Sequence, residues 1–335
     1  MDCGVLQRTV RVRPLPEVKE KKNKMTPHAA SSMDPWKNVL VALDDSEEST
    51  SILEYARHLL ARESLAVTFL RVIDCSESHA RDPAYLTDSR HRKAREMVSA
   101  AREAFAGRSG TANAEFRFGN PATEILREIV DGGHDVALLN WHGNRWLGRP
   151  VSESVANRVL MSSPIPILYF PAPAAEGVGA PSMPVRFDRV LVILDGSPEA
   201  EEILPFAERM ARTLGSDLHL FFQAIRPGKD ETARRRDADR YLTGLARHLG
   251  SRGIVCQVQV RTGPARQAVA DLLNERRFDA LALATHARSG LAQVLRGSLT
   301  KDLLRSARVP ILTVCMSDHR RLIPISGQRE PLRVE

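Results

Sequence analysis

The stretch VLVILDGS at residues 190–197 has a near copy, VLVALDDS, at residues 39–46. Each is a run of aliphatic residues that ends in Asp-x-Ser, a pattern typical of a buried strand followed by a tight turn. The two stretches lie 151 residues apart. A repeated strand of this kind indicates that the chain contains two copies of one folding unit.

A second set of matches extends the repeat toward the end of each copy, at an offset of 144 residues. The matches are Gly119 with Gly263, Asp135 with Asp279, His142 with His286, Ser154 with Ser298, and Pro166 with Pro310. The change of offset indicates an insertion or deletion between the first strand and Gly119 or Gly263.

The repeat predicts two domains, in keeping with a chain of 335 residues. We expect copy one at residues 37–171 and copy two at residues 187–316. Residues 172–186 are rich in Pro, Gly and Ala and are expected to be a linker. Residues 1–36 are expected to be a disordered basic leader, and residues 317–335 a tail.

Within each copy, short runs of Val, Ile and Leu alternate with longer amphipathic stretches, which predicts an α/β fold with a parallel sheet and crossover helices. The strands are expected at 38–43, 66–73, 113–118, 135–140 and 165–170 in copy one, and at 189–194, 217–224, 254–261, 279–284 and 309–315 in copy two. Four helices join the five strands of each copy.

The first helix of copy two has clear start and stop signals. Ser197 is a suitable N-cap, Pro198 suits the first helical position, and Gly215 follows the last turn, so one helix is expected between them. In the matching helix of copy one, Ile52 and Ala56 mark an apolar face together with Leu59 and Leu60. We therefore expect Tyr55 and His58 to pack or to face solvent rather than to bind a ligand.

Charge and composition argue against several classes of function. The net charge is +7, but the leader contributes +3 and the tail +1, so the folded body carries little of the excess that nucleic-acid binding needs. No run of eighteen apolar residues is present, and we expect no membrane span. The four cysteines have no CxxC spacing, which favours reduced thiols and a cytoplasmic location.

Ligands of open parallel sheets bind beyond the carboxyl ends of the strands, where the strand order reverses. In copy two the loop after the first strand carries Asp195, and the loop after the fourth strand covers residues 285–298. If these strands are neighbours, the two loops face one crevice. The candidate site residues are Asp195, Thr285, His286, Arg288, Gly290, Gly297, Ser298 and Leu299.

A phosphate fits this arrangement. Amides at a helix start are unpaired and electropositive, so Gly297, Ser298 and Leu299 could donate to a phosphate. Arg288 would add positive charge, and Asp195 could accept from a ribose hydroxyl or help to hold Mg²⁺. The alternative is purely structural: the Gly-Ser pair caps its helix, Asp195 caps another, and His286 braces the loop.

These motifs resemble those of the universal stress protein family, over roughly 37–171 and 187–316. The resemblance rests on Asp-x-Ser after the first strand, on GNP at 119–121 and GP at 263–264, and on a loop of the form Gly-x2-Gly-x9-Gly-Ser/Thr. It implies a strand order of 3-2-1-4-5, which makes the first and fourth strands neighbours. It also implies that members with an intact glycine loop bind ATP and that members without it do not.

Each copy departs from the family's loop in its own way. In copy two, Ala284 and Ala287 replace the first two glycines, whereas Gly297 and Ser298 match. In copy one, Asn140 and Glu153 replace the first and last glycines, and a carboxylate at Glu153 would repel phosphates. We therefore expect copy one to be degenerate; its counterpart positions are Asp44, Val72, Asn140, His142, Gly143, Glu153 and Ser154.

The resulting expectation is a cytoplasmic stress-response protein whose copy two binds ATP or another adenine nucleotide, with Mg²⁺, as a sensor. A nucleotide-free interaction scaffold of the same fold is the alternative. An ATP-cleaving enzyme of a related fold is a third reading, disfavoured because the Ser-Gly-Gly loop and the His-x-Gly-His element are absent. No catalytic residue stands out, so slow ATP hydrolysis is the most that we expect.

The partners follow from the same reasoning. We expect an adenine nucleotide and an unidentified protein, allow for a homodimer, and expect neither nucleic acid nor a membrane. The apolar fifth strands, IPILYF at 165–170 and VPILTV at 309–314, would be edges that need cover. We therefore predict two tandem doubly wound five-stranded sheets packed as a pseudo-dimer within one chain.

Overall fold

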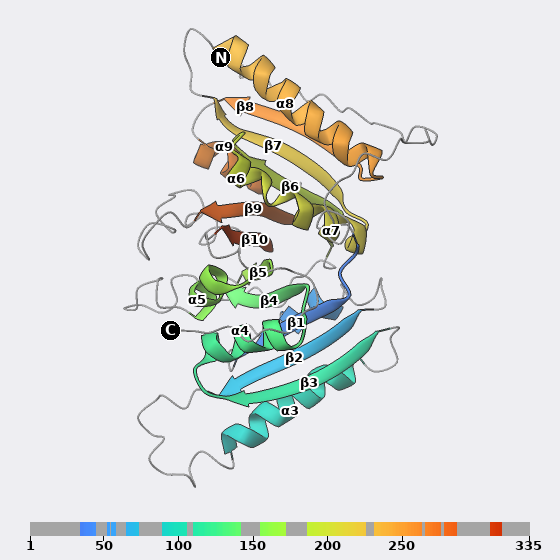
Figure 1. Ribbon diagram of the computed structural model, residues 1–335, viewed down its shortest axis with the longest axis vertical. Helices are drawn as coiled ribbons and strands as arrows, with labels where there is room; N and C mark the ends of the chain where they lie inside the picture. Colours follow the sequence, from blue (N-terminus) through green and yellow to red (C-terminus); the bar gives the residue numbers. More distant parts are fainter. Residues whose placement is uncertain are drawn as a thin grey trace, which may run out of the picture.

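A computed structural model describes residues 34–44, 52–53, 55–57, 65–73, 89–105, 110–141, 155–171, 186–225, 231–262, 265–275, 278–286 and 309–316. The strands of these residues form one ten-stranded sheet with the order β3-β2-β1-β4-β5-β10-β9-β6-β7-β8 (Figure 1). Counted within each copy, this order is 3-2-1-4-5, and the fifth strands meet at the centre. The expected topology is confirmed.

The observed elements lie close to the expected ones. The strands are β1 (Asn38–Leu43), β2 (Ala66–Ile73), β3 (Thr111–Phe118), β4 (Val136–Trp141), β5 (Ile167–Pro171), β6 (Arg189–Leu194), β7 (Asp217–Ile225), β8 (Cys256–Thr262), β9 (Ala280–His286) and β10 (Ile311–Met316). The helices are α3 (Ser89–Ala104), α4 (Pro121–Asp131), α5 (Val155–Ser162), α6 (Pro198–Glu201), α7 (Leu204–Leu214), α8 (Glu231–Ser251) and α9 (Ala265–Asn274). No helix among the described residues is long and apolar enough to cross a membrane.

The two copies join through their fifth strands. β10 pairs with β5 in the antiparallel sense, with Ile311 opposite Tyr169 and Thr313 opposite Ile167. The other strand pairs of the sheet are parallel. The predicted pseudo-dimer is therefore confirmed, with one refinement: the two halves share a continuous sheet, because each fifth strand satisfies the backbone groups of the other.

The hydrophobic core is divided by the faces of the sheet and not by the repeat. One core runs along the face that is covered by α3, α6, α7 and α8 and includes residues of both copies, such as Phe69 and Leu242. The other lies under α4, α5 and α9, also with residues of both copies, such as Ile129 and Leu272. We call these the first and second cores. Both cores extend across the seam, the line between the two copies where β5 pairs with β10. Burial as well as strand pairing therefore holds the halves together.

The helix expected between Ser197 and Gly215 is interrupted. Its start is as predicted, because the amide of Ala200 donates to Ser197 Oγ at 3.1 Å, and Gly215 ends it in the left-handed region at φ 67°. However, α6 ends at Glu201 and α7 begins at Leu204. Pro205 explains the break, because it has no amide hydrogen for the carbonyl four residues earlier and its ring clashes with that carbonyl.

The first helix of copy one packs as predicted. The ring of Tyr55 lies 4.4 Å from that of Phe170 and 6.2 Å from that of Phe187, between centroids. Burial raises the pKa of Tyr55. His58 lies outside the described residues. Because Phe187 belongs to copy two, the segment before β6 packs on the first helix of the other copy.

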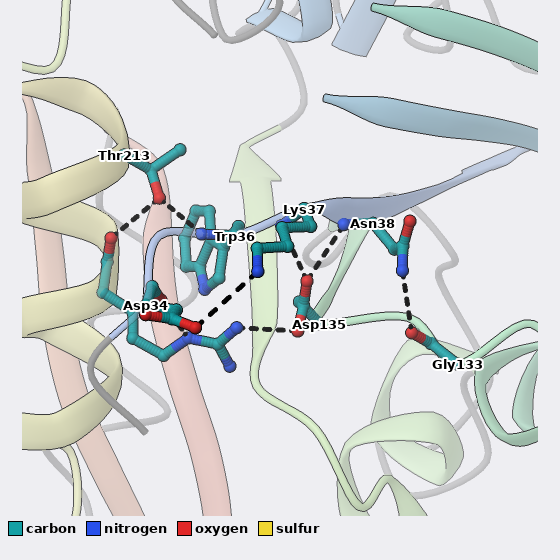
Figure 2. Close-up of polar contacts among 8 residues, drawn as sticks. Asp34, Trp36, Lys37, Asn38, Gly133, Asp135 and Thr213 are labelled. Atoms are coloured by element: carbon teal, nitrogen blue, oxygen red, sulfur yellow. Dashed lines mark hydrogen bonds and ion pairs between the residues drawn. The ribbon is translucent and has the colours of Figure 1, made fainter. Parts of the chain in front are cut away.

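Copy one makes the reciprocal contact on α7 (Figure 2). Trp36 corresponds to Phe187 in the repeat, is 2% exposed, and donates its backbone amide to Thr213 Oγ1 at 2.8 Å. Arg209 donates through Nε to the carbonyl of Asp34 at 2.9 Å and pairs through Nη2 with Asp135 Oδ1 at 2.7 Å. The segment before each first strand thus anchors its copy to the other.

Candidate functional site

The crevice expected from the sequence requires the first and fourth strands to be neighbours, and they are. In copy two, β6 pairs with β9 from Val190 opposite Ala280 to Val192 opposite Ala282. In copy one, β1 pairs with β4 in the same register. The carboxyl ends of β6 and β9 therefore lie side by side, at the point where the strand order reverses.

Asp195 lies directly after β6, and its side chain is exposed. The backbone amide and the hydroxyl of Ser197 both donate to its Oδ1, at 2.9 and 2.6 Å. Because the Ser197 hydroxyl also caps α6, Asp195 is held in place by the helix start. Both bonds use Oδ1, so the second oxygen is available to a ligand as far as the described residues are concerned.

An aromatic pair lines the other side of Asp195. Gly196 has φ 81°, and a Cβ there would lie 3.2 Å from the ring of Phe222, in the last part of β7. The ring of Phe222 lies 6.0 Å from that of Tyr241 on α8, edge to face. The Tyr241 hydroxyl donates to Glu201 Oε1 at 2.9 Å. Burial, together with the charges of Glu201 and Asp195, raises the pKa of Tyr241, so the phenol stays protonated and remains a donor.

The end of β9 is braced against β10. Thr285 is 3% exposed, and its hydroxyl donates to the carbonyl of Val314 at 3.0 Å. His286 is the last residue of the strand and lies in register with Met316. The other five predicted residues of this loop, Arg288, Gly290, Gly297, Ser298 and Leu299, lie outside the described residues, so their part in binding stays a prediction.

The counterpart positions of copy one are only partly described. Asp44 follows β1 and is half-buried, whereas Val72 is buried in the second core. Asn140 is buried near the end of β4, and neither of its amide atoms has a hydrogen-bond partner among the described residues. His142, Gly143, Glu153 and Ser154 lie outside the described residues.

Sequence reasoning missed the aromatic pair and Glu201. Phe222 could have been found from its place near the carboxyl end of the second strand, where the offset of 151 residues aligns it with Arg71. Tyr241 had no such signal, because α8 lies in the region where the repeat changes offset. Among the described residues, no group of three or more His, Cys, Asp or Glu could hold a metal ion.

The fold and the crevice define a class. The protein is a tandem of doubly wound α/β halves, and such halves take ligands beyond the carboxyl ends of their strands. The exposed carboxylate of Asp195 and the aromatic pair beside it lie at that position in copy two.

Comparison with known families then identifies the chain. The universal stress protein family matches it twice, at residues 35–171 and 186–314. The chain therefore belongs to the universal stress protein family, with two family domains in tandem. A comparison with curated proteins gave no match.

Solved structures support the fold. A universal stress protein from Archaeoglobus fulgidus DSM 4304 is 20% identical, with a TM-score of 0.65 over 83% of this chain and 98% of its own. A putative universal stress protein from Pseudomonas aeruginosa UCBPP-PA14 is 18% identical, with a TM-score of 0.58 over 87% and 97%. A functionally unknown protein from Pseudomonas aeruginosa PAO1 is 16% identical, with a TM-score of 0.57 over the same shares.

Proposed function

We propose that this universal stress protein acts in the stress response by binding ATP or another adenine nucleotide, with Mg²⁺, in copy two, as a cytoplasmic sensor. The observation that carries the proposal is the exposed, preorganised carboxylate of Asp195 beside the neighbouring end of β9. Its free oxygen is suited to a ribose hydroxyl or to Mg²⁺. The half-buried ring of Phe222, close to Gly196, offers an apolar surface for a base.

A nucleotide-free interaction scaffold is the second candidate. It is favoured by the two hydrogen bonds from Ser197 to Asp195, because a carboxylate that orders a turn needs no ligand to explain it. The shared sheet gives this candidate a physical basis as well. The tandem halves form one continuous ten-stranded sheet by themselves, which gives a scaffold a single surface.

Titration calorimetry with ATP and Mg²⁺ separates the two candidates. The wild type is expected to bind one equivalent, and Asp195→Ala and Gly297→Glu are expected to weaken binding by at least about tenfold. Gly297→Glu introduces the carboxylate that copy one carries at Glu153, where charge repulsion would act against the phosphates.

The matched control is Asp44→Ala, the same change in copy one, which should leave the affinity unchanged. Asp195→Asn removes the charge but keeps an oxygen that can accept from Ser197, so the turn is expected to remain. Comparing it with Asp195→Ala separates the effect of the charge from the effect of losing the turn. If the wild type binds no nucleotide at millimolar concentration, nucleotide binding is wrong and the scaffold stands. If Asp44→Ala weakens binding as much as Asp195→Ala, the assignment of the nucleotide to copy two is wrong.

A further inference from the structure

Four residues form a row across the carboxyl ends of the central strands in copy one. Leu43 of β1 lies opposite Arg71 of β2, and Asn140 of β4 lies opposite Phe170 of β5. Val41 faces Leu138, so Leu43 and Asn140 are neighbours two residues further on. Side chains alternate along a strand, which places this row on the face of the first core.

Copy two has the same row with different chemistry. Its members are Phe222, Leu194, Ala284 and Val314, all apolar and all part of the first core or packed against it. The central leucine is common to both copies. The residues on its two sides differ in polarity, with Arg71 in place of Phe222 and Asn140 in place of Ala284, whereas Phe170 and Val314 are both apolar.

Asn140 lacks the partners that a buried carboxamide needs. It is 7% exposed, and neither Nδ2 nor Oδ1 makes a hydrogen bond to a residue that the structure describes. Buried polar groups in folded proteins are almost always paired, so an unpaired amide requires an explanation. The alanine of copy two shows that the fold itself does not need an amide at this position.

Arg71 brings positive charge to the same row. Its Nη1 donates to the carbonyl of Leu43 at 3.3 Å, which holds the guanidinium over the residue that separates it from Asn140. A guanidinium is suited to carboxylates, which it binds through paired hydrogen bonds. Arg71 and Asn140 together therefore offer a cation, an amide donor and an amide acceptor on the two sides of Leu43.

We propose that the strand ends of copy one bind a small hydroxycarboxylate. The carboxylate accepts from the guanidinium of Arg71 and from Nδ2 of Asn140, and the hydroxyl donates to Oδ1 of Asn140. This arrangement pairs both amide atoms, which have no partner among the described residues. The two halves then differ in ligand chemistry, and the site of copy one is independent of nucleotide binding in copy two.

The test uses lactate, malate and citrate as probes on the full chain, with melting temperature and calorimetry as readouts. At least one probe is expected to raise the melting temperature of the wild type, because a ligand of the folded state stabilises it. Succinate, which lacks the hydroxyl of malate, should bind about tenfold more weakly than malate. Inorganic phosphate serves as the control for a simple anion effect.

Variants locate the site. The double variant Arg71→Phe, Asn140→Ala gives copy one the two residues that flank the central leucine in copy two, and it should lose the response. Asn140→Asp keeps the shape of the side chain while adding a charge that repels a carboxylate, so it provides the test should the double variant fail to fold. Asp195→Ala, in copy two, should respond to the probes as the wild type does.

Three results would overturn the proposal. They are no protection of the wild type by any of the three probes, equal protection of the wild type and Asn140→Asp, and equal protection by phosphate. None of them bears on nucleotide binding in copy two, which the ATP titration tests separately.

Discussion

At the scale of single residues, Gly196 shows how a motif position is fixed by its surroundings. The middle residue of the Asp-x-Ser element is Gly196 in copy two and Asp45 in copy one. In copy two the backbone has φ 81°, and the ring of Phe222 fills the space that a side chain would occupy. Only glycine meets both conditions without strain.

We predict that Gly196→Ala lowers the free energy of unfolding by more than the cost of the backbone alone. A positive φ costs a non-glycine residue about 1–2 kcal/mol, and the contact with Phe222 adds to it. Gly253→Ala is the matched control, because Gly253 has φ 86° but nothing within 4 Å of its added Cβ. Urea unfolding should rank the two variants in this order, and equal losses would contradict the role of Phe222.

At the scale of elements, the equivalent helices α4 and α9 pack on the sheet with different kinds of side chain. Glu124 and Glu128 of α4 stand where α9 has Ala268 and Leu272, and His134 stands where copy two has Phe278. These three residues of copy two are buried in the second core. In copy one the same place under the helix holds ionisable side chains.

The polar cluster under α4 is closed by Arg117 of β3. Arg117 forms an ion pair with Glu128 through Nη2 and lies 3.7 Å from Glu124 Oε2 through Nη1. His134 Nε2 lies 3.1 Å from Glu128 Oε1. Glu128 is therefore the centre of the cluster, and removing it leaves buried partners without a countercharge.

We predict that Glu128→Leu destabilises the protein by about 3–5 kcal/mol, the cost of breaking a buried ion pair on one side. The triple variant Glu124→Ala, Glu128→Leu, His134→Phe, which reproduces copy two, should recover most of that loss. Replacing a whole buried ionic cluster by apolar residues is often neutral, and Arg117, with its side chain 25% exposed, can reach solvent. Urea midpoints of the variants check this, and a triple variant no better than Glu128→Leu would contradict it.

The sequence predicts the elements well where the signal is local. Aliphatic runs place the strands, and Ser197 with Pro198 places the start of α6, because capping depends on neighbours in the chain. The break before α7 does not follow from the signals at Ser197 and Gly215, because Pro205 acts against a continuous helix between them. Phe222 and Tyr241 were missed because their meeting depends on strand register and on where α8 lies, which no local pattern encodes.

At the scale of the whole molecule, Asp135 connects the halves. Its Oδ2 accepts from the backbone amides of Lys37 and Asn38 at 2.7 and 2.9 Å, while Oδ1 pairs with Arg209 of copy two. Asp279 repeats the first of these roles, accepting from the amide of Arg189 at 2.9 Å. Both aspartates thus accept from the backbone at the start of the first strand of their own copy. Asp135 also forms the ion pair with Arg209 across the seam.

We predict that this connection weakens in acid. Burial alone would raise the pKa of Asp135, but the hydrogen bonds from Arg209, Lys37 and Asn38 and the charge of Arg209 outweigh it and leave the pKa below its ordinary value. A lowered pKa in the folded state contributes stability at neutral pH that is lost as pH falls below about 4.

The check is the difference in unfolding free energy between the wild type and Asp135→Asn across that range. It should be about 1–3 kcal/mol at pH 7 and shrink as Asp135 becomes protonated. Arg209→Met should show a smaller loss with the same trend. A difference that is independent of pH would mean that the charge of Asp135 does not hold the halves together.

Because both copies belong to one chain, a substitution at the seam changes only one of the two equivalent positions. In a dimer of identical chains, every interface substitution appears twice, and each must suit its own symmetry mate. Fusion into one chain removes that constraint, and the joined partner cannot be lost on dilution. Trp36 against α7 and Phe187 against Tyr55 are equivalent contacts that have already diverged. The polypeptide link between the copies thus lets each half evolve its own chemistry while the other preserves the assembly.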